Sequence, residues 1–223
     1  MASTEHPSDF AALFDMDGVL VDSVGLNWHA INQALAPHNV QVRDAQIHRY
    51  LGRTLEDQVA MFNDNFGLQL DFDEFQQTTE AIKVGLLPDL KPMAGVIETL
   101  EAFTTAHVPM AVGSNSPRTH VQGKLSTAGI WEYFDLVLSK DEVARPKPHS
   151  EIYERAAEGL GYATARCVVF EDSPIGVTAA KRAGTLCIAV ESAYVDPKDL
   201  FEADAIIASL TAVNVATIRQ LID

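Results

Sequence analysis

Two aspartates separated by one residue, Asp15 and Asp17, follow a short apolar run and precede Gly18 in the segment FDMDG. Side chains at positions i and i+2 of an extended chain project to the same side, so the two carboxylates should point together. Carboxylates at that spacing repel each other unless a cation lies between them. The pair therefore indicates a cation-dependent site for acid–base chemistry, with a solvated turn after a strand as the alternative for a bare D-x-D-G.

Three further polar segments also begin where apolar runs end. They are GSNSP at 113–117, RPKPH at 145–149 and FEDSPIG at 170–176. In open parallel sheets, ligands bind outside the carboxyl ends of the strands, and all four segments would lie there. We therefore expect the four segments to form one site.

The order and spacing of these segments resemble the four motifs of the haloacid dehalogenase (HAD) superfamily, specifically its phosphatase and beta-phosphoglucomutase-like branch. The resemblance covers nearly the whole chain, and four motifs in order are far more specific than one D-x-D-G. It implies a phosphatase with an α/β core built on a doubly wound, Rossmann-like parallel sheet. It also implies a helical-bundle cap domain inserted just after the first motif.

The apolar pattern fits that organisation, with residues 1–22 and 92–223 as the core and 23–91 as the cap. The run 10–14 is suited to a strand buried on both faces. Helical periodicity predicts a helix over 24–36 and three or four more across 41–88. From residue 94, strands alternate with helices, which is typical of right-handed crossovers and a doubly wound sheet. The expected strands are 108–113, 134–138, 167–170, 185–190 and 204–208, and the expected helices are 96–106, 118–128, 151–160, 175–183 and 210–222.

The formal net charge of −15 excludes nucleic acid as an expected partner, because its backbone would be repelled. The same field repels phosphorylated substrates. A divalent cation, helix N-termini and a few placed basic residues must therefore overcome it locally. We expect strict metal dependence and a small phosphorylated metabolite as the substrate.

Asp15 is the expected nucleophile and Asp17 the expected general acid and base. A carboxylate is ionised at neutral pH and can attack a phosphoryl group without a separate base. The product is an aspartyl phosphate, a mixed anhydride labile enough to pass its phosphoryl group onward. Asp17 would protonate the leaving alcohol and then activate the water.

Mg²⁺ suits this chemistry because it prefers carboxylates, waters and phosphate oxygens in octahedral geometry. The resemblance assigns the side chain of Asp15, the backbone carbonyl of Asp17 and the side chain of Asp172 as metal ligands. The neighbouring Glu171 is also a candidate for the metal site. It either orients a metal-bound water from behind the ligands or is a buried, hydrogen-bonded neighbour.

Lys147 would place a positive charge on the attacked phosphate and on Asp15. Prolines on both sides restrict the backbone of its loop. Ser114 and the backbone N–H of Asn115 would donate to the phosphate oxygens, assisted by the positive end of the following helix. Arg118 either contacts the substrate or is a solvated surface residue.

The cap loop 51–57 is the candidate for substrate choice, with Gly52 allowing a tight turn and Arg53 facing the leaving group. A plain helix-to-helix turn is the alternative. The resembled beta-phosphoglucomutases carry a His and an Arg at positions that hold Asn27 and Leu55 here. This favours a phosphatase for a phosphosugar or sugar alcohol phosphate over a hexose phosphate mutase. A pyrophosphatase, a phosphonate hydrolase using Lys83 and a non-catalytic phosphate-binding regulator are the other readings.

Composition and length place few other constraints on the protein. With 223 residues, 47% hydrophobic and 21% charged, the chain has the composition of an ordinary soluble protein. Neither a secretory signal nor a membrane span is visible. Cys167 and Cys187 fall inside expected strands as reduced core thiols. We expect a cytoplasmic protein without membrane partners, as a monomer or weak dimer.

Overall fold

The computed structural model describes residues 8–47, 49–50 and 55–222. Its contacts divide the chain into two compact units. The first comprises Met1–Asp22 and Lys91–Asp223, and the second is Ser23–Leu90. Each unit has its own buried core, so the two are described separately.

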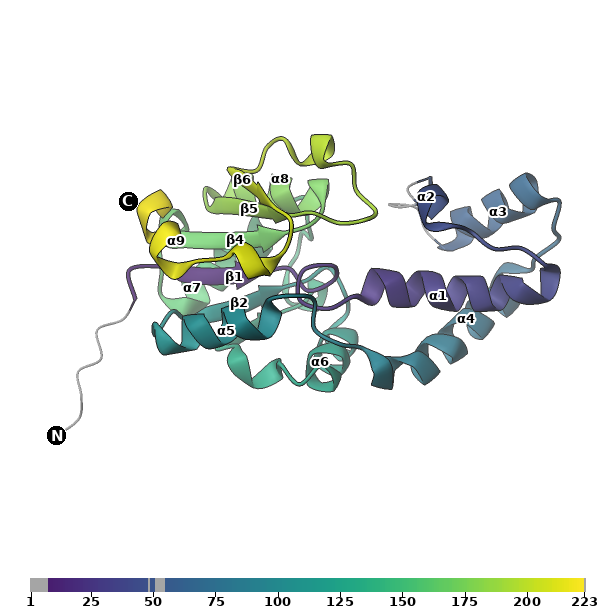
Figure 1. Ribbon diagram of the computed structural model, residues 1–223, viewed down its shortest axis with the longest axis horizontal. Coiled ribbons are helices and arrows are strands. Elements are labelled where there is room, and N and C mark those ends of the chain that lie inside the picture. The colour runs from purple at the N-terminus through teal and green to yellow at the C-terminus, as the bar shows by residue number, and fades with distance from the viewer. Residues whose placement is uncertain (1–7, 48, 51–54, 223) are drawn as a thin grey trace. The chain divides into compact units, whose positions relative to one another are not determined.

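A parallel six-stranded sheet forms the centre of the first unit (Figure 1). Its strands are β1 Ala11–Phe14, β2 Met110–Gly113, β3 Leu136–Leu138, β4 Cys167–Glu171, β5 Leu186–Val190 and β6 Ala205–Ile207. The spatial order is β3-β2-β1-β4-β5-β6, and every neighbouring pair is parallel. Chain order runs outward from β1 in both directions, so the prediction of a doubly wound α/β sheet is confirmed.

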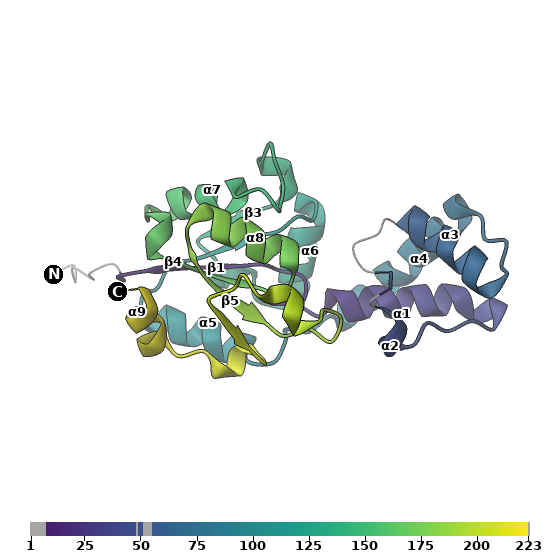
Figure 2. The same ribbon diagram turned by 90° about the horizontal axis from the view of Figure 1, so that it is seen from above.

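Helices cover both faces of this sheet, as the view from above shows (Figure 2). The helices of this unit are α5 Val96–Thr105, α6 Arg118–Thr127, α7 Glu151–Leu160, α8 Pro174–Ala183 and α9 Val215–Ile222. Short 3-10 turns occur at Trp131–Tyr133, Lys140–Glu142, Thr164–Arg166, Pro197–Leu200 and Leu210–Ala212. Among the residues that the structure describes, no helix is long and apolar enough to cross a membrane.

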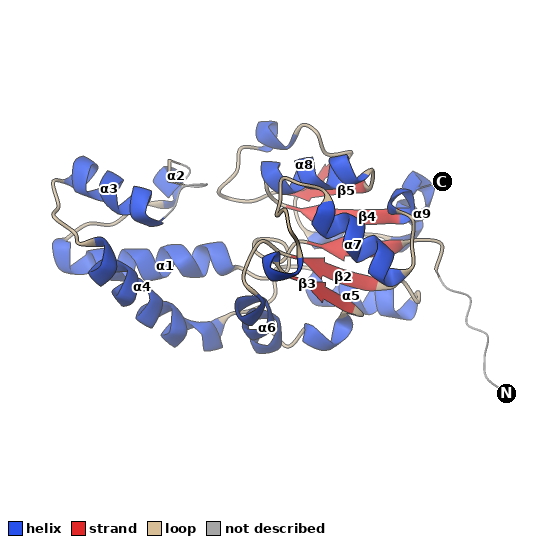
Figure 3. Ribbon diagram, turned by 180° about the vertical axis from the view of Figure 1, so that it is seen from behind, coloured by secondary structure: helices blue, strands red, loops and turns tan. Residues whose placement is uncertain are grey.

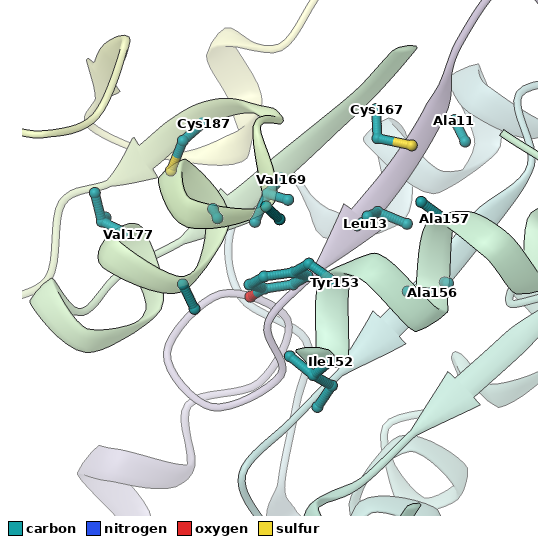
Figure 4. Close-up of a cluster of buried hydrophobic side chains, with 14 of the residues drawn as sticks. Ala11, Leu13, Ile152, Tyr153, Ala156, Ala157, Cys167, Val169, Val177 and Cys187 are labelled. Carbon is teal, nitrogen blue, oxygen red and sulfur yellow. The ribbon is translucent and has the colours of Figure 1, made fainter. Parts of the chain in front are cut away.

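The two faces of β1 pack against different helices because its side chains alternate. Ala11 and Leu13 join a buried cluster with Tyr153 of α7, which Figure 4 shows in close-up. Phe14 lies on the other face, where its ring stacks on that of Phe170 with centroids 4.9 Å apart. Both faces of β1 are therefore fully buried, and the residue that continues the Leu13 face beyond the strand is Asp15.

The C-terminal helix is shorter than the expected 210–222. Leu210–Ala212 forms a separate 3-10 turn, and α9 begins only at Val215. The reason is the side chain of Asn214, whose Oδ1 accepts hydrogen bonds from the N–H groups of Ala216 and Thr217. Such a cap satisfies the first free N–H groups of a helix and fixes where it begins.

The second unit is helical (Figure 3). Its helices are α1 Ser23–Leu35, α2 Asp44–Ile47, α3 Leu55–Phe66 and α4 Phe72–Leu86, with 3-10 turns at Ala36–His38 and Leu87–Asp89. The core includes the fully buried Phe62, whose ring contacts those of Tyr50 and Phe75. The side chain of Asn32 closes the α1–α2 connection by pairing with both backbone groups of Val42. Aromatic packing and such local clamps together give this small unit its own core.

Both cysteines lie in the core of the first unit. Cys167 and Cys187 are fully buried free thiols. Burial raises the pKa of the Cys167 thiol to about 12. Such thiols stay protonated and pack as small apolar side chains.

Candidate active site

The first motif forms a tight loop directly beyond β1. The N–H of Asp15 donates to the carbonyl of Phe170 at 2.9 Å, which places the aspartate at the carboxyl edge of the sheet. Gly18 has a φ of 89° and donates its N–H to the carbonyl of Val21. This loop carries Asp15 and Asp17 outward at the edge where the other motifs also end.

A glycine is required at position 18 because of its backbone conformation and because the carboxylate of Asp172 approaches it closely. A Cβ on this residue would lie 2.0 Å from Oδ2 of Asp172. The absence of a side chain thus lets the carboxylate of the fourth motif lie against the loop of the first. The Gly of D-x-D-G has a direct part in bringing the acidic residues together.

Lys147 joins the first, third and fourth motifs through its ammonium group. Nζ lies 2.6 Å from Oδ1 of Asp15 and 2.6 Å from Oε1 of Glu171. It also lies 4.8 Å from the centre of the Tyr153 ring. Burial opposes its charge, but the two carboxylates outweigh burial and raise the pKa of Lys147. The lysine is therefore a fixed positive charge beside Asp15.

The loop that carries Lys147 is held by the second motif. The side chain of Asn115 accepts from the Lys147 N–H at 3.0 Å and donates to the Lys147 carbonyl at 3.1 Å. Ser114, which is fully buried, receives the N–H of Ser116 on its Oγ. The amide of Asn115 therefore positions the lysine, a contact that the expected role of its backbone N–H did not include.

The carboxylate of Glu171 is buried and bonded on both oxygens. Oε1 accepts from Lys147 and, at 2.7 Å, from the hydroxyl of Tyr153. Oε2 accepts from the hydroxyl of Ser173 at 3.0 Å and from the N–H of Asp172 at 3.1 Å. These contacts are compatible with both interpretations of Glu171, as a group behind the metal ligands and as a buried, hydrogen-bonded neighbour.

Three carboxylates form a cluster with the geometry of a metal-binding site. One oxygen from each of Asp15, Glu171 and Asp172 lies within 4.8 Å of the others. Burial, partly offset by Lys147, raises the pKa of Asp15 to about 7. Burial and the charges of Asp15 and Glu171 likewise raise the pKa of Asp172. With three carboxylates gathered around the Lys147 ammonium, the cluster is compatible with a divalent cation.

The side chain of Asp17 is held by groups from the segment after β2. Oδ2 accepts from the hydroxyl of Ser116 at 2.8 Å, and Oδ1 lies 2.5 Å from Nζ of Lys124 on α6. About a quarter of each ionic side chain is exposed, 27% for Asp17 and 22% for Lys124. Asp17 is thus more open to solvent than Asp15, although the two are only two residues apart.

The structure brings together the expected residues of the four motifs. Asp15, Lys147, Glu171 and Asp172 are in direct or near contact, with Asp17, Ser114 and Asn115 at the same edge of the sheet. Arg118 has 39% of its side chain exposed, as expected of a surface residue, while its guanidinium donates to the carbonyl of Val137 and lies over the Trp131 ring. Gly52 and Arg53, the expected cap residues, lie outside the described residues.

Three contacting residues were not among the expected site residues. Tyr153 has the spacing of a core residue on an amphipathic helix, and Lys124 that of an ordinary polar helix residue. Ser116 lies inside the second motif and was visible in the sequence as a hydroxyl two residues after Ser114. Only the last of these had a local signal in the sequence.

Comparisons with known proteins identify the family to which the chain belongs. The family model for haloacid dehalogenase-like hydrolases matches residues 12–190. Validoxylamine A 7'-phosphate phosphatase of Streptomyces hygroscopicus subsp. limoneus is 32% identical over 207 residues, which cover 91% of this chain and 95% of that protein. The phosphorylated carbohydrates phosphatase of Thermotoga maritima is 29% identical over 198 residues, covering 88% and 92%.

A solved structure shows the same fold over almost the full length. The HAD family hydrolase from Deinococcus radiodurans R1, crystallised with bound phosphate and sodium, superposes with a TM-score of 0.87. The two chains are 28% identical, and the match covers 97% of each. The chain belongs to the haloacid dehalogenase-like hydrolase family, and it is a phosphatase of that family.

Proposed function

We propose that this protein is a Mg²⁺-dependent phosphomonoester hydrolase for a phosphorylated sugar or sugar alcohol, acting through an aspartyl phosphate. The observation that supports this most directly is the Lys147 ammonium 2.6 Å from Asp15. A nucleophile with a fixed cation beside it can approach a phosphate whose own negative charge would otherwise repel it. The four-motif site therefore fits phosphoryl transfer better than simple phosphate binding.

In the first step a carboxylate oxygen of Asp15 attacks phosphorus and forms a P–O bond. The bond between phosphorus and the leaving alcohol breaks, and Asp17 gives that oxygen a proton. Lys147 neutralises charge on the phosphoryl oxygens throughout. The hydroxyl of Ser114 and the N–H of Asn115 are the proposed donors to the same oxygens.

In the second step water attacks the phosphorus of the aspartyl phosphate. Asp17, now ionised, takes the proton from the water, the P–O bond to Asp15 breaks, and inorganic phosphate leaves. Both aspartates return to their starting states. The different surroundings of the two residues, one buried against Lys147 and one partly exposed, suit this division of labour.

Mg²⁺ fits the donor set because that set is made of carboxylate and carbonyl oxygens, the ligands that this hard cation prefers. Asp15, the carbonyl of Asp17 and Asp172 would hold the ion, with Glu171 orienting them from behind. When bound, it would supply the positive charge that lets phosphate approach these carboxylates.

The substrate class rests on the relatives. The names of two similar proteins specify a phosphate ester of validoxylamine A and phosphorylated carbohydrates. Both proteins match this chain over nearly their full lengths. A small polyhydroxylated phosphomonoester is therefore the proposed substrate class.

The test is phosphate release from a panel of sugar and sugar alcohol phosphates, with nucleotides and phosphoserine as contrasting esters. Each is assayed with Mg²⁺ and with excess chelator, and Asp15→Asn serves as the blank. We expect release that depends on Mg²⁺ and is fastest for sugar-type esters. Full activity in chelator would reject the metal, and a preference for nucleotides would reject the substrate class.

A further inference from the structure

We propose that Lys124 is a positioning residue that, together with Ser116, fixes the carboxylate of Asp17 for proton transfer. The inference rests on the proposed function, in which Asp17 exchanges a proton with the leaving group and with water. Lys124 itself need not contact the substrate. Its effect would be exerted through the orientation of Asp17.

The contacts restrain the carboxylate from two sides. Lys124 Nζ lies 2.5 Å from Oδ1, and the Ser116 hydroxyl donates to Oδ2 at 2.8 Å. The two donors come from different parts of the chain, one from α6 and one from the loop that precedes it. Because each oxygen has its own donor, rotation about the Cβ–Cγ bond of Asp17 would break both contacts.

Contacts along helix α6 fix the backbone position from which the Lys124 side chain extends. Val121 and Leu125, on either side of Lys124 in the helix, are fully buried. The N–H of Arg118, at the start of α6, donates to Asp141 at 2.8 Å, and its guanidinium donates to Val137. The lysine thus reaches Asp17 from a helix that is fixed at its start and packed along its length.

A purely stabilising role explains the pair poorly. Ion pairs that are partly exposed contribute little to stability, because solvent screens them and ordering long side chains costs entropy. Proton transfer, by contrast, depends steeply on distance and direction, and a positioned acid or base contributes about 10²–10⁴-fold to rate. We therefore expect this contact at the acid–base residue to affect the rate of catalysis more than the stability of the fold.

The same unit contains a matched ion pair away from the site. Lys181 on α8 lies 2.6 Å from Asp204, with side-chain exposures of 33% and 36%. This pair resembles Lys124–Asp17 in chemistry, distance and exposure. Lys181→Met is therefore the control for any general effect of losing a partly exposed lysine.

The test uses a series of phosphate monoesters whose leaving groups range from alkyl alcohols to dinitrophenol. Esters with poor leaving groups need a proton from Asp17, whereas dinitrophenolate leaves without one. In Lys124→Met we expect kcat/KM to fall by about tenfold or more for the alkyl esters, and by less than about threefold for the dinitrophenyl ester. The plot of log kcat/KM against leaving-group pKa should become steeper.

Two further variants complete the design. Lys124→Arg should restore much of the alkyl ester activity, and Ser116→Ala should change the slope in the same direction as Lys124→Met. Lys181→Met should leave the slope unchanged at a similar melting temperature.

An equal loss for all esters in Lys124→Met, a rise for the alkyl esters, or an unchanged slope would overturn the role of Lys124. If Lys124→Met does not fold, Ser116→Ala decides by the same criterion. Lack of turnover in the wild type would instead reject the proposed function, so the two failures are distinguishable.

Discussion

Gly176 on α8 lies directly against the carboxylate of Glu171. A Cβ at Gly176 would fall 1.8 Å from the carboxyl carbon of Glu171, well inside van der Waals contact. Glu171 is in turn one of the two carboxylates that hold Lys147. The first turn of α8 thus sets how far Glu171 can withdraw from the site, and with it the position of the ammonium.

Gly176→Ala should accordingly impair the site as well as the fold. The added methyl group must displace Glu171, both of whose carboxylate oxygens already accept hydrogen bonds from neighbouring groups. We expect a loss of about 1–3 kcal/mol in the free energy of unfolding, typical of overpacking. Misplacing Lys147 by about 1 Å should lower kcat by about a hundredfold. Denaturant unfolding and steady-state phosphate release measure the two effects.

Gly85→Ala in α4 is the matched control for this substitution. A Cβ at that helical glycine would meet nothing within 4 Å. The change should stabilise the protein by about 0.4–1 kcal/mol, because alanine restricts the unfolded chain. Near-normal stability and turnover in Gly176→Ala would contradict the steric argument.

Asp15→Asn should remove turnover and leave the fold intact. The amide has nearly the same size but cannot attack phosphorus, so phosphate release should fall by at least about 10³-fold. Asp9→Asn is the control, since Asp9 is an exposed aspartate paired with Arg219 near the start of the same strand. Circular dichroism checks folding in both variants. Substantial activity in folded, pure Asp15→Asn would exclude Asp15 as the nucleophile.

The metal-free protein should lose stability as the pH rises toward neutrality. Burial raises the pKa of Asp15 from 3.8 to about 7 in the folded state, and the pKa of Asp172 is raised in the same direction. Between pH 3.8 and about 7, the two pKa values of Asp15, the folded chain binds more protons than the unfolded one. The free energy of unfolding therefore falls with increasing pH. The contribution is complete below the unfolded pKa and lost above the folded one.

Melting temperatures at about pH 5 and about pH 7.5 in chelator test this linkage. The melting temperature of the wild type should fall more between the two pH values than that of Asp15→Asn, which has no proton to lose at that position. Added Mg²⁺ should raise the melting temperature more at the higher pH, because the ion replaces protons on the carboxylates. Equal pH dependence in the two proteins would show that Asp15 does not titrate in this range.

The sequence predicted best those site residues that come directly after a strand of the parallel sheet. Asp15 and Asp172 could be expected at one edge because each directly follows an apolar strand, and parallel strands end together. Lys147 lies well beyond β3 and was expected there from the order of the motifs. The partners Lys124 and Tyr153 could not be expected there, because both lie within helices and not in a segment that follows a strand. Helical periodicity assigns such residues to a face of a helix but does not say which loop they reach.

Local capping explains where the expected elements were too long. The helix expected over 210–222 was divided because Asn214 caps a new helix in its middle. The strand expected from residue 108 starts at Met110, after a turn in which His107 has a φ of 55° and the Val108 N–H bonds to Phe103. Apolar residues in these turns are buried like strand or helix residues, and their pattern alone does not distinguish them.

We expect this protein to hydrolyse hexose phosphates and not to interconvert them as a mutase does. A mutase must hold its substrate in two orientations and rephosphorylate it before water reaches the aspartyl phosphate, which calls for a second phosphate clamp in the cap. Arg is best suited to that clamp because its planar group binds phosphate through two hydrogen bonds. Leu55, at the start of α3, and Asn27, within α1, hold the positions where the resembled mutases carry Arg and His.

With beta-glucose 1-phosphate, a trace of the 1,6-bisphosphate and Mg²⁺, we therefore expect inorganic phosphate to exceed glucose 6-phosphate. Both products are measured over the same time course. The double variant Asn27→His, Leu55→Arg supplies the missing groups and should shift the ratio toward glucose 6-phosphate, whereas Asn27→His alone lacks the clamp and should not. If the wild type forms glucose 6-phosphate much faster than it releases phosphate, it is a mutase. Leu55 would then not prevent mutase activity.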